Sequence, residues 1–345
     1  MAMKHDFETL YFKAAFCLTS DVISDFNPVS RRLGVDVTDG MGTVFTALGA
    51  RYEMRYVADE AFLTTDSYET DTRSIDNVPV AEVMRYTRGQ ILREDAVPGK
   101  YAGFVENVKA GKSVFHDYKV YSSGEKDAAV LYLISPADKT PEKSAEAFAK
   151  LAEKIGKSAY STNEFGDCGY LKIQLELFKE LEESAEAVKA ALEKYDQIVT
   201  DDQFILDALL IQFEDMADKI LFIDGFIAGN AGKLGISAAG KKIAVHESGI
   251  INRLYPLRKA DYVEVLKDAE LVYPARNGYD VSDSGMAGGL GLADEEVMKA
   301  VAGRREKDLE ALGADVIVSV CAAEKAGLEA GGGKVESLLC YAAAL

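Results

Sequence analysis

A chain of 345 residues is long enough for two or three hydrophobic cores, so the sequence predicts more than one domain. Hydrophobic residues make up 48% and charged residues 28%, as in soluble globular proteins. The formal net charge of -18 argues against nucleic acid or an anionic membrane as a partner, because both require a basic face. With no run of about 18 uncharged apolar residues and no signal-peptide core, we expect no membrane insertion and a cytoplasmic location.

The N-terminal third predicts short helices separated by loops. A helix is expected at residues 8–16, and Pro28 and Gly34 mark a loop and a turn after it. Residues 60–74 are almost purely polar and predict a solvated loop. A further helix is expected from about residue 78 to residue 92, because Pro79 suits a first helical turn.

The remaining chain predicts one α/β unit twice. In the first copy we expect a strand at 129–134, a helix at 144–155, a turn at 165–169, a helix at 171–194 and a strand at 197–202. Strands and helices that alternate in this way are typical of α/β crossover folds.

The second copy follows the same order. We expect strands at 243–245 and 270–273, a glycine-rich turn at 281–289, a helix at 293–312 and a closing strand within 314–324. Asp167-Cys168-Gly169 in the first copy corresponds to Asp283-Ser284-Gly285 in the second. The sequence therefore predicts an internal repeat.

Cysteine usage gives no direct metal signal. The four cysteines, Cys17, Cys168, Cys321 and Cys340, include no C-x-x-C pair, so their spacing supports neither a zinc site nor an iron–sulfur site. On composition alone they are ordinary buried thiols.

Two segments nevertheless have the spacing of an iron–sulfur motif without its ligands. The step of +3, +3, +4 matches the C-x-x-C-x-x-C-x-x-x-C frame that binds a cubane cluster. The positions are Cys17, Ser20, Ile23 and Asn27, with Pro28 following, and Thr64, Ser67, Thr70 and Ser74. Hydroxyls and amides are poor ligands for iron–sulfide, so the frame lacks its chemistry.

With these motifs in this order, the chain resembles heterodisulfide reductase subunits C and B joined in one polypeptide. The same arrangement occurs in the D-type subunit and in the iron–sulfur subunits of glycolate oxidase and glycerol-3-phosphate dehydrogenase. The resemblance implies a helical ferredoxin-like N-terminal domain at 1–124. It also implies two pseudo-symmetric α/β domains of the C-C-G type, at 125–235 and 236–345.

Most of the family's cluster ligands are replaced. A C-C-G domain of the family supplies a leading cysteine, the C-C-G and a downstream C-x-x-C. In the first half the resemblance places the leading position near Ser135. The other replaced positions implied by the resemblance are Asp167, Cys168, Asp202 and Ile205 in the first half, and Gly249, Asp283, Ser284, Cys321 and Glu324 in the second. The family's clusters and electron transfer therefore do not carry over residue by residue.

The positions of the second half should converge if the family's fold is kept. His246, Asp283, Cys321 and Glu324 would then form a pocket that could hold zinc or another divalent ion. The competing interpretation, which we favour, makes them polar side chains that bond to each other in a filled cavity. Gly285, Gly288 and Gly289 could cradle a phosphate, although we favour a glycine turn retained from a cluster loop.

Neither thiol chemistry nor a resident cofactor is expected. Asp167 should raise the pKa of the Cys168 thiol and make it a poor nucleophile. The leading hypothesis is a cluster-free, catalytically silent scaffold or regulatory subunit of a redox complex, with a cluster-bearing paralogue as a candidate partner. We expect the acidic loop at 60–76 to dock on that partner.

Two alternatives stay open. One is a working iron–sulfur electron-transfer or disulfide reductase subunit, whose clusters would need non-cysteine ligands or a partner chain. The other is a binder of a small molecule or metal in the vacated pockets. The family occurs in methanogenic energy metabolism and in 2-hydroxy-acid oxidation, so both settings are open.

Overall fold

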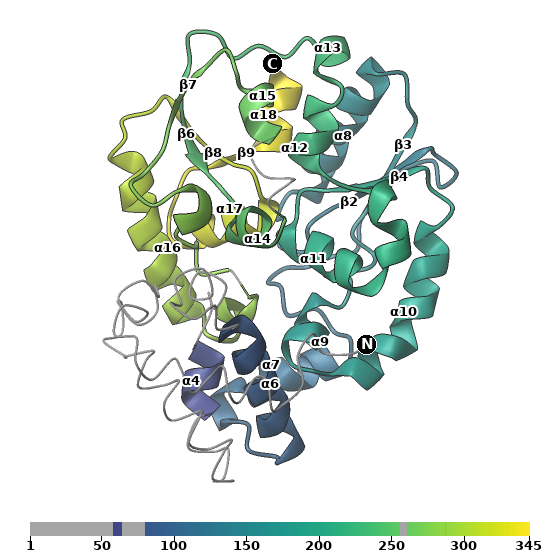
Figure 1. Cartoon of the computed structure of the whole chain (residues 1–345), viewed down its shortest axis with the longest axis vertical. Helices are drawn as coiled ribbons and strands as arrows, with labels where there is room; N and C mark the ends of the chain where they lie inside the picture. The colour runs from purple at the N-terminus through teal and green to yellow at the C-terminus, as the bar shows by residue number, and fades with distance from the viewer. Residues whose placement is uncertain (1–57, 64–79, 256–260, 287) are drawn as a thin grey trace.

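The computed structural model describes residues 58–63, 80–255, 261–286 and 288–345 (Figure 1). The fold is mixed α/β with mainly parallel strands, which confirms the predicted class. Helices of the N-terminal part lie below two sheets in this view. These helices are α4 (Ala58–Leu63), α6 (Val80–Arg93) and α7 (Gly99–Lys109).

The first sheet has five strands in the order β1-β3-β2-β4-β5. Its strands are β1 (Ser122–Gly124), β2 (Val130–Leu133), β3 (Ala159–Thr162), β4 (Gln197–Thr200) and β5 (Ile220–Phe222). All pairs are parallel except the antiparallel pair of β1 and β3. The associated helices are α8 (Pro141–Lys154), α9 (Tyr170–Gln174), α10 (Phe178–Leu192), α11 (Gln203–Gln212), the 3₁₀ turn η3 (Glu214–Lys219), α12 (Ile223–Ala228) and α13 (Ala231–Leu234).

The second sheet has four parallel strands in the order β7-β6-β8-β9. Its strands are β6 (Lys242–His246), β7 (Glu270–Val272), β8 (Val316–Ser319) and β9 (Glu336–Ser337). The other elements of this half are α14 (Gly249–Leu254), α15 (Asp261–Val265), η4 (Gly278–Asp280), η5 (Leu290–Ala293), α16 (Glu295–Glu310), α17 (Ala322–Ala330) and α18 (Leu338–Ala344).

Apart from β1, the two sheets have the same strand order. In each, the first strand of the unit lies between the second and third strands, so the order reverses between β2 and β4 and again between β6 and β8. A helix of each half also packs against the other half. Helix α12, which follows β5, packs on α15, and α18, which follows β9, packs on α8. Each half therefore helps to cover the other.

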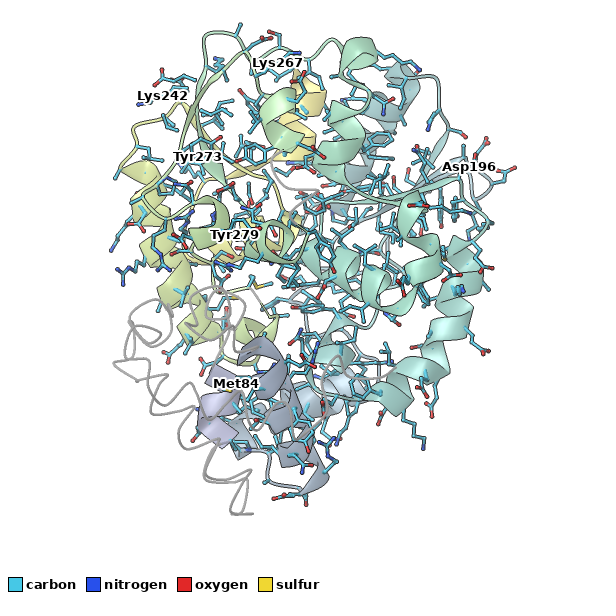
Figure 2. All side chains as sticks on the ribbon, viewed as in Figure 1. Met84, Asp196, Lys242, Lys267, Tyr273 and Tyr279 are labelled. Atoms are coloured by element: carbon cyan, nitrogen blue, oxygen red, sulfur yellow. The ribbon has the colours of Figure 1, made fainter. Side chains whose placement is uncertain are left out.

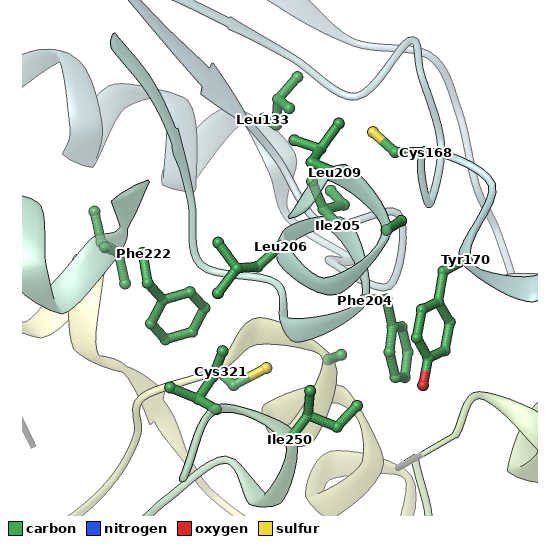
Figure 3. Packing of buried hydrophobic residues seen from close by; sticks show 14 of the residues in the cluster. Leu133, Cys168, Tyr170, Phe204, Ile205, Leu206, Leu209, Phe222, Ile250 and Cys321 are labelled. Atoms are coloured by element: carbon green, nitrogen blue, oxygen red, sulfur yellow. The ribbon is translucent and has the colours of Figure 1, made fainter. Parts of the chain in front are cut away.

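The apolar core is continuous across both halves. Helix α11 lies between them, and its residues from Gln203 to Leu209 are all buried. Figure 3 shows Phe204 of α11 beside Tyr170 of α9, with ring centroids 4.6 Å apart. Burial of apolar surface on this scale is the main stabilising contribution to the fold.

A buried arginine joins the N-terminal helices to the first half. Arg88 of α6 donates from Nε to the carbonyl oxygen of Gln174 at 3.0 Å and from Nη1 to that of Ala61 at 3.0 Å. In Figure 2, Met84 of the same helix lies in this lower layer, whereas Lys267 and Asp196 lie at the edges of the view. A guanidinium can be buried at this position because backbone acceptors satisfy it.

One sequence-based boundary was wrong. Residues 171–194 were expected to form one helix, but the chain breaks between α9 and α10, where Glu176 has a φ of 54°. The closing strand expected within 314–324 is β8 (Val316–Ser319), and α17 follows from Ala322. In addition, β1 at Ser122–Gly124 precedes the expected start of the α/β region.

Candidate functional site

Asp202 and Cys321, two of the site positions predicted from the sequence, occupy equivalent places after β4 and β8 in the two sheets. Strand β4 ends at Thr200 and β8 ends at Ser319, each opposite the last residue of the strand it pairs with. Asp202 and Cys321 both lie two residues beyond those ends and are the N-cap residues of α11 and α17. Both positions therefore lie at the carboxyl edge of their sheet, where the strand order reverses.

The two glycines of the compared turns both have a positive φ. Gly169 has a φ of 88° and Gly285 a φ of 86°. A Cβ on Gly285 would lie 2.7 Å from the carbonyl oxygen of Met298, and one on Gly169 would lie 2.3 Å from a methyl of Leu181. Left-handed geometry and close packing together require glycine at both sites.

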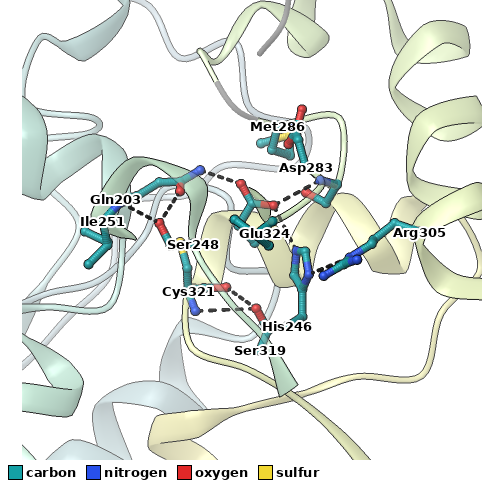
Figure 4. Close-up of polar contacts among 12 residues, drawn as sticks. Gln203, His246, Ser248, Ile251, Asp283, Met286, Arg305, Ser319, Cys321 and Glu324 are labelled. Atoms are coloured by element: carbon teal, nitrogen blue, oxygen red, sulfur yellow. Dashed lines mark hydrogen bonds and ion pairs between the residues drawn. The ribbon is translucent and has the colours of Figure 1, made fainter. Parts of the chain in front are cut away.

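Three side chains form a buried row in the second half. Arg305 of α16 donates from Nε to Nδ1 of His246 at 3.1 Å, and Nε2 of His246 lies 3.0 Å from Oε2 of Glu324 (Figure 4). Because Nδ1 accepts a hydrogen bond, we assign the imidazole proton to Nε2, which donates to Glu324. A neutral histidine thus bridges a guanidinium and a carboxylate.

The protonation states follow from burial and from these bonds. Burial lowers the pKa of His246 and is the largest effect; the hydrogen bond to Glu324 opposes it, and the charge of Arg305 acts in the same direction as burial. Burial would raise the pKa of Glu324, but the bond from His246 and its other donors hold that pKa below its ordinary value. Burial lowers the pKa of Arg305 to about 10. At neutral pH the row therefore holds one positive charge, one negative charge and a neutral ring.

Further donors connect this row to the first half. Gln203 of α11 donates from Nε2 to Oε1 of Glu324 at 2.6 Å, and the Ser284 backbone N–H donates to Oε2 at 3.0 Å. Ser248 donates to Oε1 of Gln203 at 2.6 Å and accepts from the Ile251 N–H at 3.1 Å. Both oxygens of Glu324 and both ring nitrogens of the histidine are therefore occupied.

The other sequence-predicted positions of the second half have different partners. Asp283 accepts from the Met286 N–H at 3.1 Å. Cys321 is fully buried; burial, with nearby carboxylates, raises the pKa of its thiol well above the ordinary value. Gly249 is the first residue of α14. The structure thus brings His246, Ser284 and Glu324 into direct contact but leaves Gly249 outside the network.

In the first half the predicted position Asp167 bonds to backbone groups of its own turn. Asp167 accepts from the backbone N–H groups of Gly169 at 3.0 Å and Leu171 at 2.9 Å. Cys168 is buried, and burial followed by the charge of Asp167 raises the pKa of its thiol well above the ordinary value. This direction agrees with the expected weak nucleophile.

The remaining positions of the first half lie on α11. Asp202 accepts from the Ser135 hydroxyl and from the Phe204 N–H, and burial raises its pKa to about 6. Ile205 is an apolar core residue with 1% of its surface exposed. The Ser135 hydroxyl is therefore bonded to Asp202, and these are the two places where the resemblance would put a leading cysteine and a C-x-x-C cysteine.

No group of three or more His, Cys, Asp or Glu side chains within the described ranges is placed to hold a metal ion. For the second half the physical reason is visible. A metal would need a free ring nitrogen and a free carboxylate oxygen, but Arg305, Gln203 and the Ser284 N–H compete for them.

The N-terminal motif positions lie outside the described residues. They are Cys17, Ser20, Ile23, Asn27, Thr64, Ser67, Thr70 and Ser74. Nearly all of the acidic loop at 60–76 falls in the same gaps. Within the part of the chain that the structure describes, no helix is long and apolar enough to cross a membrane.

Sequence reasoning missed Gln203 and Arg305. Gln203 directly follows Asp202, but no motif marks it. Arg305 lies in a helix with charged residues on most of its faces, where it looks like a solvated side chain, yet only 1% of its surface is exposed. Only its packing against His246 identifies its role.

Comparisons with known proteins assign no family to the chain. No family model matches it, and no curated protein matches it. One solved structure, that of an aspartate racemase homologue from Pyrococcus horikoshii, aligns with 63% of this chain and 96% of its own length at 16% identity, with a TM-score of 0.27. A similarity this low carries no argument, so fold and function have to be argued from the chain's own residues.

Proposed function

We propose that this chain is a cluster-free, catalytically silent relative of the heterodisulfide reductase C and B subunits that acts as a scaffold or regulatory partner in a redox complex. In this proposal the two α/β halves are C-C-G-type domains, and the N-terminal part is a ferredoxin-like domain that has lost its clusters. Clusters for electron transfer would reside in a partner chain.

One observation carries the proposal: the hydrogen-bonded row of Arg305, His246 and Glu324. Glu324 stands at a C-x-x-C position, and both of its oxygens are engaged by side-chain and backbone donors. A cluster-binding site must leave its ligands free to reach the metal, whereas these groups satisfy one another. Such a network supports a stable fold without metal-coupled folding.

The alternative function is a working iron–sulfur electron-transfer or disulfide reductase subunit. Cys168 and Cys321 could each contribute one thiolate to a cluster. Their thiol pKa values lie well above the ordinary value, which disfavours the thiolate that iron requires. The alternative therefore needs non-cysteine ligands or a partner chain.

Anaerobic purification tests the proposal. Iron and acid-labile sulfide are measured together with the visible spectrum, and a known iron–sulfur protein expressed in the same cells serves as control. We expect no stoichiometric iron and no broad band near about 400 nm, the absorbance expected of thiolate-ligated clusters. Near-stoichiometric iron and sulfide would support the alternative.

A second measurement addresses the partner. The tagged chain is cross-linked in its native cells, and the attached proteins are identified. The scaffold role predicts recovery of a cluster-bearing protein in a fixed ratio. If the chain is recovered alone at native abundance, the scaffold role is wrong.

A further inference from the structure

A cavity of about 470 Å³ lies beside the Asp167-Cys168-Gly169 turn of the first half. It is bounded by the loop that joins α7 to β1, by the turn itself, by α10 and by the end of α11. It shares no residue with the network around Glu324. Its volume falls in the range of small-ligand pockets.

The loop that forms one wall is fixed to the first sheet. The Tyr118 hydroxyl donates to the carbonyl oxygen of Asn163 at 2.6 Å, and the Tyr121 N–H donates to Oδ1 of Asn163 at 2.7 Å. Asn163 directly follows β3 and is buried. This wall is therefore in place before a ligand arrives, as in most small-molecule sites.

The walls of the cavity are mainly apolar and aromatic. Phe115, Tyr118, Phe165 and Val188 line it. Val120, also in the lining, is 66% exposed, more than any other large hydrophobic side chain in the part of the chain that the structure describes. Aromatic walls that end in an exposed valine favour an occupant with a flat apolar body.

The charged groups of the lining balance one another in number. Two lysines, Lys112 and Lys172, are matched by two carboxylates, Glu164 and Asp167. Both oxygens of Asp167 already accept from backbone N–H groups of the turn. A ligand with a net charge would lose hydration without gaining an unmatched counter-charge, so the lining favours a neutral ligand.

Two polar side chains of the lining can orient such a ligand. Nζ of Lys172 donates to the carbonyl oxygen of Glu180 at 2.9 Å and to Oγ of Ser184 at 3.3 Å, which leaves one of its N–H groups for a ligand. The amide nitrogen of Gln212 donates to two backbone carbonyl oxygens, at 2.8 and 2.9 Å, and its Oε1 accepts from no described residue. The cavity therefore offers a donor and an acceptor beside its apolar walls.

We propose that this cavity binds a neutral small molecule with an aromatic ring and an amide group. The ring lies against the aromatic walls. The amide oxygen accepts from Lys172, and the amide nitrogen donates to Oε1 of Gln212. The site is separate from the proposed scaffold role, and either can fail without the other.

Probes of one shape and different charge test the site. The compounds 2-naphthamide, 2-naphthoate and 2-naphthylmethylamine share a bicyclic ring and are neutral, negative and positive at neutral pH, while propionamide carries the amide without the ring. Binding to the full chain is measured by calorimetry and by the rise in unfolding temperature with probe concentration. Naphthalene fluorescence gives an independent signal, because the chain has no tryptophan. We expect 2-naphthamide to bind at least about fivefold more tightly than each of the other probes.

Variants locate the binding and test the charge balance. Val120→Asp removes apolar surface from the cavity, and we expect it to weaken 2-naphthamide at least about fivefold. Val263→Asp, at an exposed valine outside the cavity, is the matched control and should leave the affinity unchanged. Lys172→Met removes one positive charge from the lining and should shift the preference from the amide probe towards the amine probe.

Several results would overturn the proposal. It is wrong if 2-naphthamide does not bind, or if either charged probe binds as tightly to the parent chain. It is also wrong if Val120→Asp binds 2-naphthamide like the parent chain, or if Lys172→Met leaves the affinities of all probes unchanged.

Discussion

Glu324→Gln is the sharpest test of the buried row. The substitution keeps the shape of the side chain but removes its charge, so the buried Arg305 guanidinium loses one of the carboxylates that favour its charged form, while Asp308 and Glu247 remain. The new amide NH₂ also faces a group that donates, either Gln203 at the Oε1 position or His246 and the Ser284 N–H at the Oε2 position. Breaking a buried charge pair from one side costs about 3–5 kcal/mol, so we expect a loss of that size in the free energy of unfolding.

Equilibrium urea unfolding measures the loss. The chain has 17 tyrosines and no tryptophan, so tyrosine fluorescence and far-ultraviolet circular dichroism are the probes. Glu329→Gln is the matched control: it lies on the same helix and forms a salt bridge with Lys325, but 29% of its side chain is exposed. Partly exposed pairs contribute little, and we expect less than about 1 kcal/mol for this control.

A double-mutant cycle separates the charge pair from other effects. Arg305→Met alone should be costly because it leaves the carboxylate of Glu324 uncompensated, whereas the double variant removes both charges. We therefore expect the double variant to cost less than the sum of the single changes by at least about 1 kcal/mol. Strict additivity, or a cost for Glu324→Gln no larger than that of its control, would refute the assignment of a charged row.

Three further predictions concern single residues. Burial and Asp138 raise the pKa of Asp201 to about 8 from an ordinary 3.8. The fold therefore favours the protonated carboxyl, and the stability that this group contributes is complete below about pH 4 and is lost as the pH rises towards 8. Asp201→Asn should then be increasingly more stable than the parent over that interval, by on the order of 5 kcal/mol at the upper end, and parallel pH profiles of unfolding would contradict this. Gly285→Ala should lower stability by about 2–3 kcal/mol in urea unfolding, because its φ of 86° is strained for alanine and the Cβ meets a backbone carbonyl; an unchanged midpoint would show that the turn can relax. Gly89→Ala should cost about 1–3 kcal/mol by the same measurement, because its Cβ would lie 2.1 Å from an oxygen of Glu176, and a gain in stability would mean that this carboxylate moves freely.

Local pattern was sufficient for the main elements. The helix expected at 144–155 is α8 (Pro141–Lys154), and the one expected from about residue 78 to residue 92 is α6 (Val80–Arg93). The apolar run at 129–134 contains β2, whose four residues are all buried. These predictions succeeded because the spacing of apolar residues, which indicates a helix or a strand, can be seen within a few neighbouring residues.

The break in the helix expected at 171–194 had no such signal. Glu176 adopts a left-handed conformation within a continuous helical pattern, and its carboxylate pairs with Arg93 at 3.0 Å, 83 residues earlier in the chain. A contact over that separation leaves no trace in the local spacing of apolar residues.

The sequence by itself predicted the strands β2, β4, β6, β7 and β8, the glycine turns and the polar character of the positions after the strands, but it missed β3, β5 and β9. The tertiary structure alone decided which polar groups meet. Arg305 bonds to a histidine 59 residues away, that histidine to a glutamate 78 residues away, and Gln203 to the same glutamate across 121 residues. Elements form through interactions between near neighbours, whereas a buried hydrogen bond needs both partners placed to within a few tenths of an ångström by the packing of whole sheets.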